Sequence, residues 1–265
     1  MIGSSLTLHI SNFVAVVTLN RPDVRNAFNA ELIADITRTF SDLGLRGDVR
    51  CIVLAANGTA FCAGADLNWM RSMADYTHEQ NLADAGRLAA MMQAVYECPK
   101  PTIARIQGEV YAGGMGLVAA CDIAVSVDAA NFCLSEVKLG LVPSTISPYV
   151  IRAMGARAAH RYFLTAEKFT AAEALRIGFI HEVVAADSLN AKVAELSMAL
   201  GNAGPGAVKL CKTLVQDVVG RPITAELVQM TVASIADVRV SSEGREGLQA
   251  FLHKRKPNWL PHAQS

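Results

Sequence analysis

The sequence predicts an α/β fold of stacked strand–strand–helix units with a helical C-terminal part. Short apolar runs with strand character alternate with helical patterns at roughly even spacing, without sequence repetition, as far as about Pro143. Beyond that residue almost every periodic segment is helical. Alternation of this kind is typical of α/β proteins rather than β-sandwiches. We therefore expect a core domain over 1–195 and a helical oligomerisation or lid region over 196–265.

The elements of the core follow from apolar periodicity. Leu6–Ile10 and Val14–Leu19 form a predicted strand pair, and Asn29 can cap a helix with apolar residues at helical spacing. Further strands are expected over Cys51–Ala56, Thr102–Ile106, Ile123–Val127 and Asn131–Cys133, and helices over Thr77–Val95 and up to Leu117–Ala120. The expected later helices are Ser147–Met154, Ala156–Leu164, Ala171–Ile177, Ser188–Leu200, Gly206–Val219, Ala225–Val238 and Glu243–Phe251.

Composition excludes several function classes. The 265 residues are 52% apolar and carry no formal net charge, and Lys and Arg are scattered, so no basic surface is available for nucleic acid. The six cysteines form no CxxC pair and are expected to be buried in a reducing compartment. The six histidines lack metal-ligand spacing. Without a recognisable export signal or an apolar stretch long enough to span a membrane, we expect a cytoplasmic protein that uses no membrane, metal or redox cofactor.

Two glycine-rich segments are the most informative motifs. Phe61–Leu67 reads FCAGADL, and Gly108–Gly116, about forty residues later, reads GEVYAGGMG. Each follows a predicted strand and precedes a predicted helix, where small residues allow close approach of a ligand to free backbone N–H groups. Two such turns face to face can form an oxyanion hole, a pair of N–H donors around one oxygen atom. Each motif alone also fits an ordinary tight turn.

A dinucleotide-binding loop is an alternative for the second segment. Gly114-x-Gly116-x-x-Ala119 matches the GxGxxG/A pattern, and Glu136 follows about twenty residues later. However, the stretch Gln107–Ala112 separates this pattern from its strand, whereas the dinucleotide-binding turn is tight. The match is therefore weak.

Glu136 is the candidate acid or base, because it lies in an apolar neighbourhood. One interpretation is a partly desolvated carboxyl group with a raised pKa, suited to general acid–base work. The alternative is an exposed carboxylate on a strand face that pairs with Lys138.

Four motifs together resemble the enoyl-CoA hydratase/isomerase (crotonase) superfamily. They are FCAGADL, GEVYAGGMGLVAACD, LSEVKLGLVP and, near the C-terminus, AFLHKRKP, and the resemblance covers almost the whole chain. Within the superfamily, GADLNWM, LSEV and ISP are similar to bacterial hydratases of branched, carboxylated enoyl-CoAs: the methylglutaconyl-CoA hydratases of leucine breakdown and the carboxygeranoyl-CoA hydratases of terpene breakdown. The resemblance implies a spiral of ββα units, an acyl-CoA thioester substrate and a homo-oligomer, either a trimer or a dimer of trimers.

The resemblance also implies roles for particular residues. The N–H groups of Ala65 and Gly113 form the oxyanion hole, and Glu136 is the catalytic acid–base. The residues implied to bind the acyl-CoA are Ala63, Asp66, Leu67 and Gly114 along the crevice, Arg25 and Ala27 near the nucleotide end, and Lys254, often from a neighbouring subunit. Ordinary solvation is the alternative for Lys254.

The departure from the family pattern is Gly116. Two-carboxylate hydratases carry a first catalytic Glu there and a second at the position of Glu136. A single carboxylate favours a double-bond isomerase on chemistry alone, whereas the subgroup resemblance favours a hydratase. A third possibility is an acyl-CoA-binding subunit with weakened catalysis. For a hydratase, the missing carboxylate could be replaced by a water or anion in the vacated space, by a hydroxyl of Ser144, Thr145 or Tyr111, or by the substrate's own carboxylate.

Two further groups of residues are candidates for the acyl pocket. Trp69, Met70 and Met73 follow the first motif at helical spacing and fit either ordinary packing or a pocket lining. The cations to test as partners of a substrate carboxylate are Arg71, Arg105 and Arg152.

Overall fold

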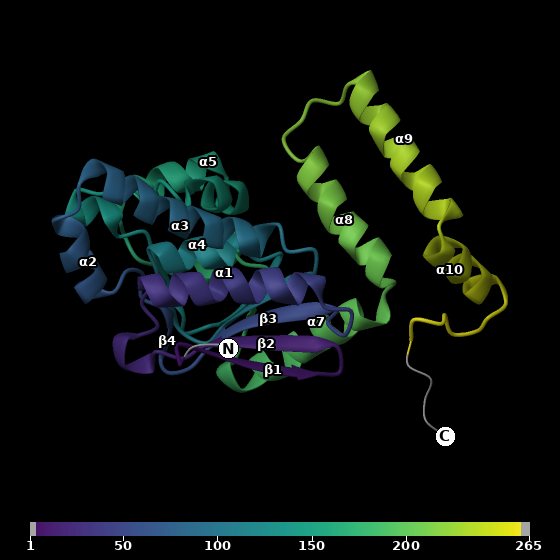
Figure 1. The fold of residues 1–265 in the computed structure, drawn as a ribbon, viewed down its shortest axis with the longest axis horizontal. Coiled ribbons are helices and arrows are strands. Elements are labelled where there is room, and N and C mark those ends of the chain that lie inside the picture. The colour runs from purple at the N-terminus through teal and green to yellow at the C-terminus, as the bar shows by residue number, and fades with distance from the viewer. Residues whose placement is uncertain (1–3, 261–265) are drawn as a thin grey trace.

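Strand–strand–helix units wind into a spiral in the computed structural model, which describes residues 4–260. The elements are β1 (Leu6–Ser11), β2 (Val14–Leu19), α1 (Ala30–Leu45), β3 (Cys51–Ala56), β4 (Ala60–Cys62), α2 (Leu67–Ala74), α3 (His78–Tyr96), β5 (Thr102–Ile106), β6 (Glu109–Tyr111), α4 (Gly113–Ala120), β7 (Ile123–Val127), β8 (Asn131–Cys133), α5 (Ser147–Thr165), β9 (Phe169–Thr170), α6 (Ala171–Arg176), β10 (Glu182–Val184), α7 (Leu189–Asn202), α8 (Pro205–Val218), α9 (Ala225–Val240) and α10 (Ser242–Leu252). The predicted mixed α/β fold is confirmed (Figure 1).

The strands form two sheets within residues 4–260. The longer strands make a six-stranded sheet in the order β1-β2-β3-β5-β7-β10, and the short ones a four-stranded sheet in the order β4-β6-β8-β9. From β2 to β10 the strands of the large sheet run parallel, as do β4, β6 and β8 in the small one. The loops that leave β4 and β6 therefore start at the same edge of the small sheet, and this brings the two glycine motifs together.

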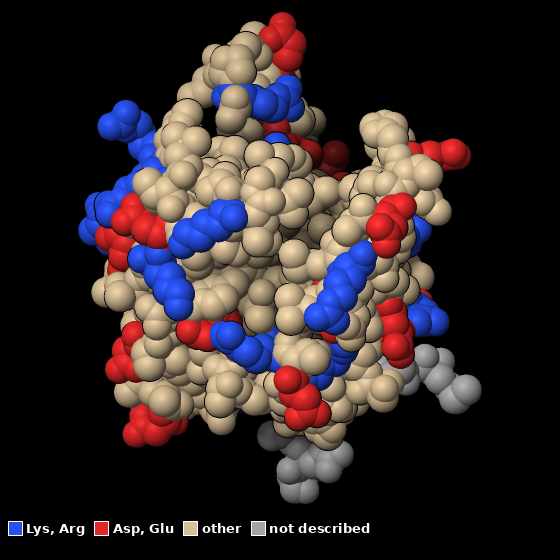
Figure 2. All heavy atoms as spheres, turned by 90° about the vertical axis from the view of Figure 1, so that its left-hand side faces the viewer, with Lys and Arg blue, Asp and Glu red and all other residues tan. Residues whose placement is uncertain are grey.

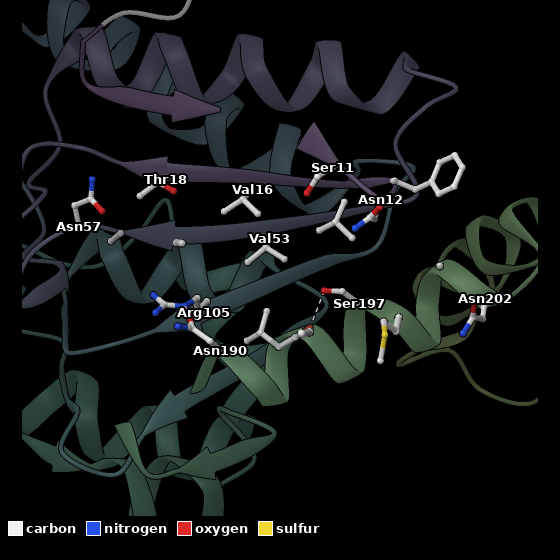
Figure 3. A pocket seen from close by; sticks show the side chains of 18 residues that line it. Ser11, Asn12, Val16, Thr18, Val53, Asn57, Arg105, Asn190, Ser197 and Asn202 are labelled. Atoms are coloured by element: carbon white, nitrogen blue, oxygen red, sulfur yellow. Dashed lines mark hydrogen bonds between the residues drawn. The ribbon is translucent and has the colours of Figure 1, made fainter. Parts of the chain in front are cut away.

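The core lies between the large sheet and helices α1, α3 and α4. As expected, Asn29 caps α1: its side chain accepts a hydrogen bond of 2.9 Å from the backbone N–H of Leu32. The apolar face of α1, which includes Ile36 and Phe40, is fully buried. In Figure 3, α1 lies on one side of strands β1 to β3 and α7 on the other.

Helix α5 contains a break that the sequence indicates. Gly155 has φ 75° and ψ 157° in the middle of α5, so the helix consists of two halves. These halves correspond to the predicted helices Ser147–Met154 and Ala156–Leu164. Of the six cysteines, five are buried as expected, and Cys211 on α8 is exposed.

Helices α8 to α10 stand apart from the spiral at one end of the molecule (Figure 1). Lys212 of α8 fastens them to the core, since its ammonium group lies 2.8 Å from a carboxylate oxygen of Asp122. The expected boundary at residue 195 falls inside α7, which continues to Asn202. The division into a core and a helical C-terminal region stays a prediction.

Candidate functional site

The two glycine-rich turns lie in direct contact. Gly64 has φ +90°, and a Cβ atom there would come within 2.9 Å of the Cβ of Ala112. A Cβ on Gly114 would lie 2.8 Å from the Cβ of Cys62 and 2.9 Å from its carbonyl oxygen. Only glycine allows such an approach at these positions, and at Gly64 it also relieves the positive φ. The small residues of each motif are thus explained by the packing of one turn against the other.

Two residues of these turns line one cavity and have backbone N–H groups without an acceptor among the described residues. Gly113 is the first residue of α4, where no intrahelical partner exists for its N–H, and Ala65 directly precedes the residue that caps α2. Both residues line the same cavity, and within residues 4–260 neither N–H donates a hydrogen bond. Ala112, just before Gly113, has φ 47° and ψ −121°, a backbone strain of about 1–3 kcal/mol that is typical of functional sites. The arrangement can hold one oxyanion between two donors.

Glu136 brings a carboxyl group into this cavity. It opens a 3-10 helix, Glu136–Leu139, after β8, so the alternative of a strand residue paired with Lys138 is wrong. Its Oε2 is buried and has no hydrogen-bond partner among the described residues. Burial raises the pKa of this carboxyl group above its ordinary value, which favours the neutral acid. The interpretation as a partly desolvated acid–base is therefore supported by the structure.

The cavity is about 670 Å³ and its wall is mainly apolar. Helices α2 and α3 and the segment after Glu136 form the wall, and Trp69, Met70 and Met73 belong to it. The indole Nε1 of Trp69 is buried without a hydrogen-bond partner among residues 4–260. Figure 2 looks onto the α2 end of the molecule, where uncharged atoms fill the middle of the face and several Lys and Arg surround them. The shape and polarity suit an apolar chain that carries a few polar groups.

The space beside Gly116 is filled by apolar side chains. A Cβ on Gly116 would lie 2.3 Å from Cγ2 and 2.7 Å from Cβ of Ile146, and 3.0 Å from Cε of Met92. A side chain at this position would therefore have to displace Ile146. Replacement of the missing carboxylate by a water or an anion stays a prediction. The hydroxyl of Tyr111 is unsuitable, because it donates to Glu109 at 2.5 Å and lies outside the cavity lining.

The dinucleotide-binding alternative fails on the same segment. Gly114 and Gly116 lie inside helix α4, whereas the glycines of a dinucleotide-binding loop form the turn before the helix. These glycines instead allow close packing of α4 against Cys62 and Ile146.

Among the predicted substrate-binding residues, Ala63 and Leu67 line the cavity and Asp66 does not. The Asp66 carboxylate caps α2 by accepting a hydrogen bond of 2.8 Å from the N–H of Asn68, and it pairs with Arg21 at 2.9 Å. Burial opposes ionisation of Asp66, but these hydrogen bonds outweigh it and hold its pKa below the ordinary value. The structure thus gives Asp66 a positioning role at the start of α2, and its contact with CoA stays a prediction.

The remaining predicted CoA-binding residues lie outside the cavity lining. Arg25 pairs with Glu109 and lies over the ring of Tyr111, at 5.6 Å from the ring centroid. Ala27 is buried. Gly114 is packed inside α4 as described above. Lys254 follows α10, at the opposite end of the molecule from α2 (Figure 1). Their roles toward CoA stay predictions.

None of the three arginines predicted to pair with a substrate carboxylate lines the cavity. Arg71, Arg105 and Arg152 are all absent from its lining, and Arg71 and Arg105 bind asparagine side chains. Sequence reasoning missed Asp84, which is buried and does line the cavity. A signal for it exists, because an acid four residues before Leu88 lies on the apolar face of a long helix.

A second, larger cavity of about 880 Å³ lies between α7 and the face of β1 to β3 (Figure 3). Ser197, Arg105 and Asn190 line it, and neither glycine motif contributes to it. Size therefore does not identify the site; the chemistry of the lining does. Within residues 4–260, no three His, Cys, Asp or Glu side chains are grouped to hold a metal ion. No helix in that range is long and apolar enough to cross a membrane.

Several known proteins similar to this chain are enoyl-CoA hydratases by name. The family model described as Enoyl-CoA hydratase/isomerase matches residues 9–262. An enoyl-CoA hydratase structure from Shewanella pealeana is 43% identical, covers 96% of each chain and has a TM-score of 0.94. One from Mycobacterium smegmatis is 32% identical, covers 96% of this chain and 98% of that one, and has a TM-score of 0.90. The enoyl-CoA hydratase AFT6-1 of Alternaria alternata is 38% identical over 75% of this chain and 65% of its own length.

Proposed function

Because the chain belongs to the enoyl-CoA hydratase/isomerase family, we propose that it is an enoyl-CoA hydratase, a hydro-lyase that adds water across the α,β double bond of an enoyl-CoA thioester. One observation carries the proposal. The free N–H groups of Ala65 and Gly113 and the buried carboxyl group of Glu136 line a single, mainly apolar cavity.

The chemistry follows from this arrangement. Water attack at C3 of the substrate places negative charge on the thioester oxygen, and two preorganised N–H donors stabilise that enolate. Loss of one such donor typically costs a factor of about 10²–10³ in kcat. Burial raises the pKa of Glu136 and so favours its neutral form, which is suited to give a proton to C2. No metal or redox group is needed for this sequence of steps.

An isomerase is the closest alternative, since Gly116 provides no second carboxylate. The names of the relatives favour the hydratase, because all three proteins described above are called enoyl-CoA hydratases. A binding subunit with weakened catalysis is less consistent with a buried, unpartnered Glu136, because burying such a group lowers stability unless it has a use.

For the acyl group we propose a branched enoyl chain, with methylglutaconyl-CoA as the narrower candidate from the sequence resemblance. The volume and apolar wall support a branched chain. A carboxylated chain also needs a cation, and none lines the described cavity. Arg87 pairs with the lining residue Asp84 at 2.7 Å and is our candidate for this cation.

We further propose a homo-oligomer, a trimer or a dimer of trimers. Helices α9 and α10 expose many large apolar side chains: Val228, Val232, Ile235, Val240, Leu248, Phe251 and Leu252. Such a surface is typical of an interface with another copy. Lys254 beside it would then reach the CoA of a neighbouring subunit.

The function is tested by incubating the protein with crotonyl-CoA and methylglutaconyl-CoA and following the loss of conjugated thioester absorbance. We expect hydration that falls by about 10²–10⁴ in Glu136→Gln, with Glu195→Gln on the exposed face of α7 as the matched control. Conversion of a 3-enoyl-CoA to its 2-enoyl isomer without hydration would favour the isomerase. Tight CoA binding without turnover would favour the binding subunit.

A further inference from the structure

The attacking water lacks a carboxylate partner at position 116. Ile146 and Met92 crowd the Cβ position of Gly116, so a side chain there would have to displace them. Hydration then needs a group elsewhere in the cavity wall that holds the water and accepts its proton.

Asp84 is the other acid in the wall. Besides Glu136 it is the only charged side chain among the described lining residues. The hydroxyls of Ser144 and Thr145 also belong to the lining, but a neutral hydroxyl is a far weaker base than a carboxylate. Asn81 directs its amide N–H groups to the carbonyls of Tyr76 and Thr77.

The position of Asp84 is not explained by stability. The residue is only 4% exposed, and one carboxylate oxygen, Oδ1, accepts a hydrogen bond of 2.7 Å from Arg87 in the next turn of α3. Within residues 4–260, no group donates to the other oxygen, Oδ2. A helical pair of this kind contributes about 0.3–0.5 kcal/mol when exposed, whereas burying a carboxylate costs several kcal/mol. A buried acid with one anchored oxygen and one free oxygen is arranged to bind something in the cavity.

We propose that Asp84 is the second carboxylate of the active site. It binds the attacking water through its free oxygen, while Glu136 donates a proton to C2 of the substrate. The inference rests on the hydratase function proposed above. As the water oxygen forms its bond to C3, one water O–H bond breaks and that proton passes to Asp84. The electron pair of the double bond moves toward the thioester oxygen between Ala65 and Gly113. Collapse of this enolate takes a proton from Glu136 at C2. Asp84 gains one proton and Glu136 loses one, and exchange with solvent after product release restores both.

The test separates water addition from proton transfer at C2. Hydration of the best substrate is compared with deuterium exchange at C2 of butyryl-CoA in D₂O, a reaction that needs Glu136 and the oxyanion hole but no attacking water. In Asp84→Asn we expect the hydration kcat to fall by about 10²–10⁴, while exchange stays close to the wild-type rate. In Glu136→Gln both reactions should be lost.

Asp35→Asn is the matched structural control. Asp35 is 3% exposed and pairs with Arg38 in the next turn of α1, as Asp84 does with Arg87, but it lies outside the cavity. We expect the Asp35→Asn protein to catalyse both hydration and deuterium exchange at the wild-type rate. Should Asp84→Asn fail to fold, Asp84→Glu keeps the charge and shifts it by one methylene, and hydration should still fall selectively.

Two results would overturn the inference while leaving the proposed function intact. One is hydration at the wild-type rate in a folded Asp84 variant. The other is loss of exchange together with hydration, which would mean that Asp84 only supports the structure around Glu136. Absence of hydration by the wild-type protein on every enoyl-CoA would instead refute the proposed function.

Discussion

Because apolar side chains fill the space beside Gly116, we expect Gly116→Ala to lower the stability of the protein. A methyl group added there must displace Ile146, whose Cγ2 lies 2.3 Å from the ideal Cβ position. Overpacking a core typically costs about 1–3 kcal/mol. At roughly 2–4 °C per kcal/mol for a large domain, Gly116→Ala should lower Tm by about 2–12 °C.

Gly86→Ala provides the matched control on helix α3. Gly86 is exposed in the interior of the helix, and a Cβ there meets nothing within 4 Å. Alanine is favoured over glycine in a helix by about 1 kcal/mol, so this substitution should raise Tm by about 2–4 °C. Circular dichroism melts of both variants at equal protein concentration provide the comparison.

The double variant Gly116→Ala/Ile146→Ala tests whether Ile146 is the cause. Ile146→Ala alone should cost about 2–5 kcal/mol through the cavity it leaves. In the double variant the new methyl group occupies part of that cavity, so the two effects should fall short of their sum by about 0.5–3 kcal/mol. Strict additivity, or a Gly116→Ala protein as stable as Gly86→Ala, would refute the reasoning.

The other predictions concern the site and the C-terminal helices. Burial raises the pKa of Glu136, so the stability that its neutral form allows is complete below about pH 4.3 and is lost as pH rises through the raised pKa. Glu136→Gln should therefore have a higher Tm than wild type at pH 7 but not at pH 4. An equal increase in Tm at both pH values would contradict this. Asp66→Ala removes the α2 cap and the partner of Arg21 and should cost at least about 1 kcal/mol, whereas Asp66→Asn keeps a capping side chain and should unfold at a higher temperature than Asp66→Ala. Val232→Glu together with Ile235→Glu should prevent assembly of the proposed oligomer in light scattering, because both residues are exposed on α9; a mass equal to that of an oligomeric wild type would place the interface elsewhere.

The sequence is informative where a pattern is local. Strands β3, β5 and β7 have their predicted bounds, because mainly apolar runs end at polar or small residues. Strands β4, β6, β9 and β10 have only two or three residues each, too few to show any periodicity. Their pairing is set by the spiral rather than by their own composition.

The residues of the site likewise differ in how far a local sequence pattern reveals them. Glu136 and the two glycine turns are recognisable because motif residues adjoin strands and helix starts. The contact of Gly116 with Ile146 is not, because it joins residues far apart in the chain, and a glycine in a sequence gives no sign of what fills its missing side chain. Asp84 lies between these cases, since its place on an apolar helix face is visible in the sequence but its role depends on the cavity that other segments complete.

The C-terminal helices are fastened to the core at both their beginning and their end. Glu243 of α10 accepts hydrogen bonds of 2.9 and 2.7 Å from the N–H groups of Gly206 and Ala207 at the start of α8. Arg50 binds the carbonyl of Gly201 at the end of α7 and that of Trp259 after α10. Arg50 thus holds both ends of the segment α8 to α10 to the core, and Lys212 attaches α8 to it in between.

Small movements at these attachments are enlarged along the helices. The 16 residues of α9 span about 24 Å, so a slight tilt of α8 moves the far end of the exposed apolar surface of α9 much further than the residues that cause the tilt. Loss of the Arg50 guanidinium should thus shift an apolar surface that Arg50 itself does not touch.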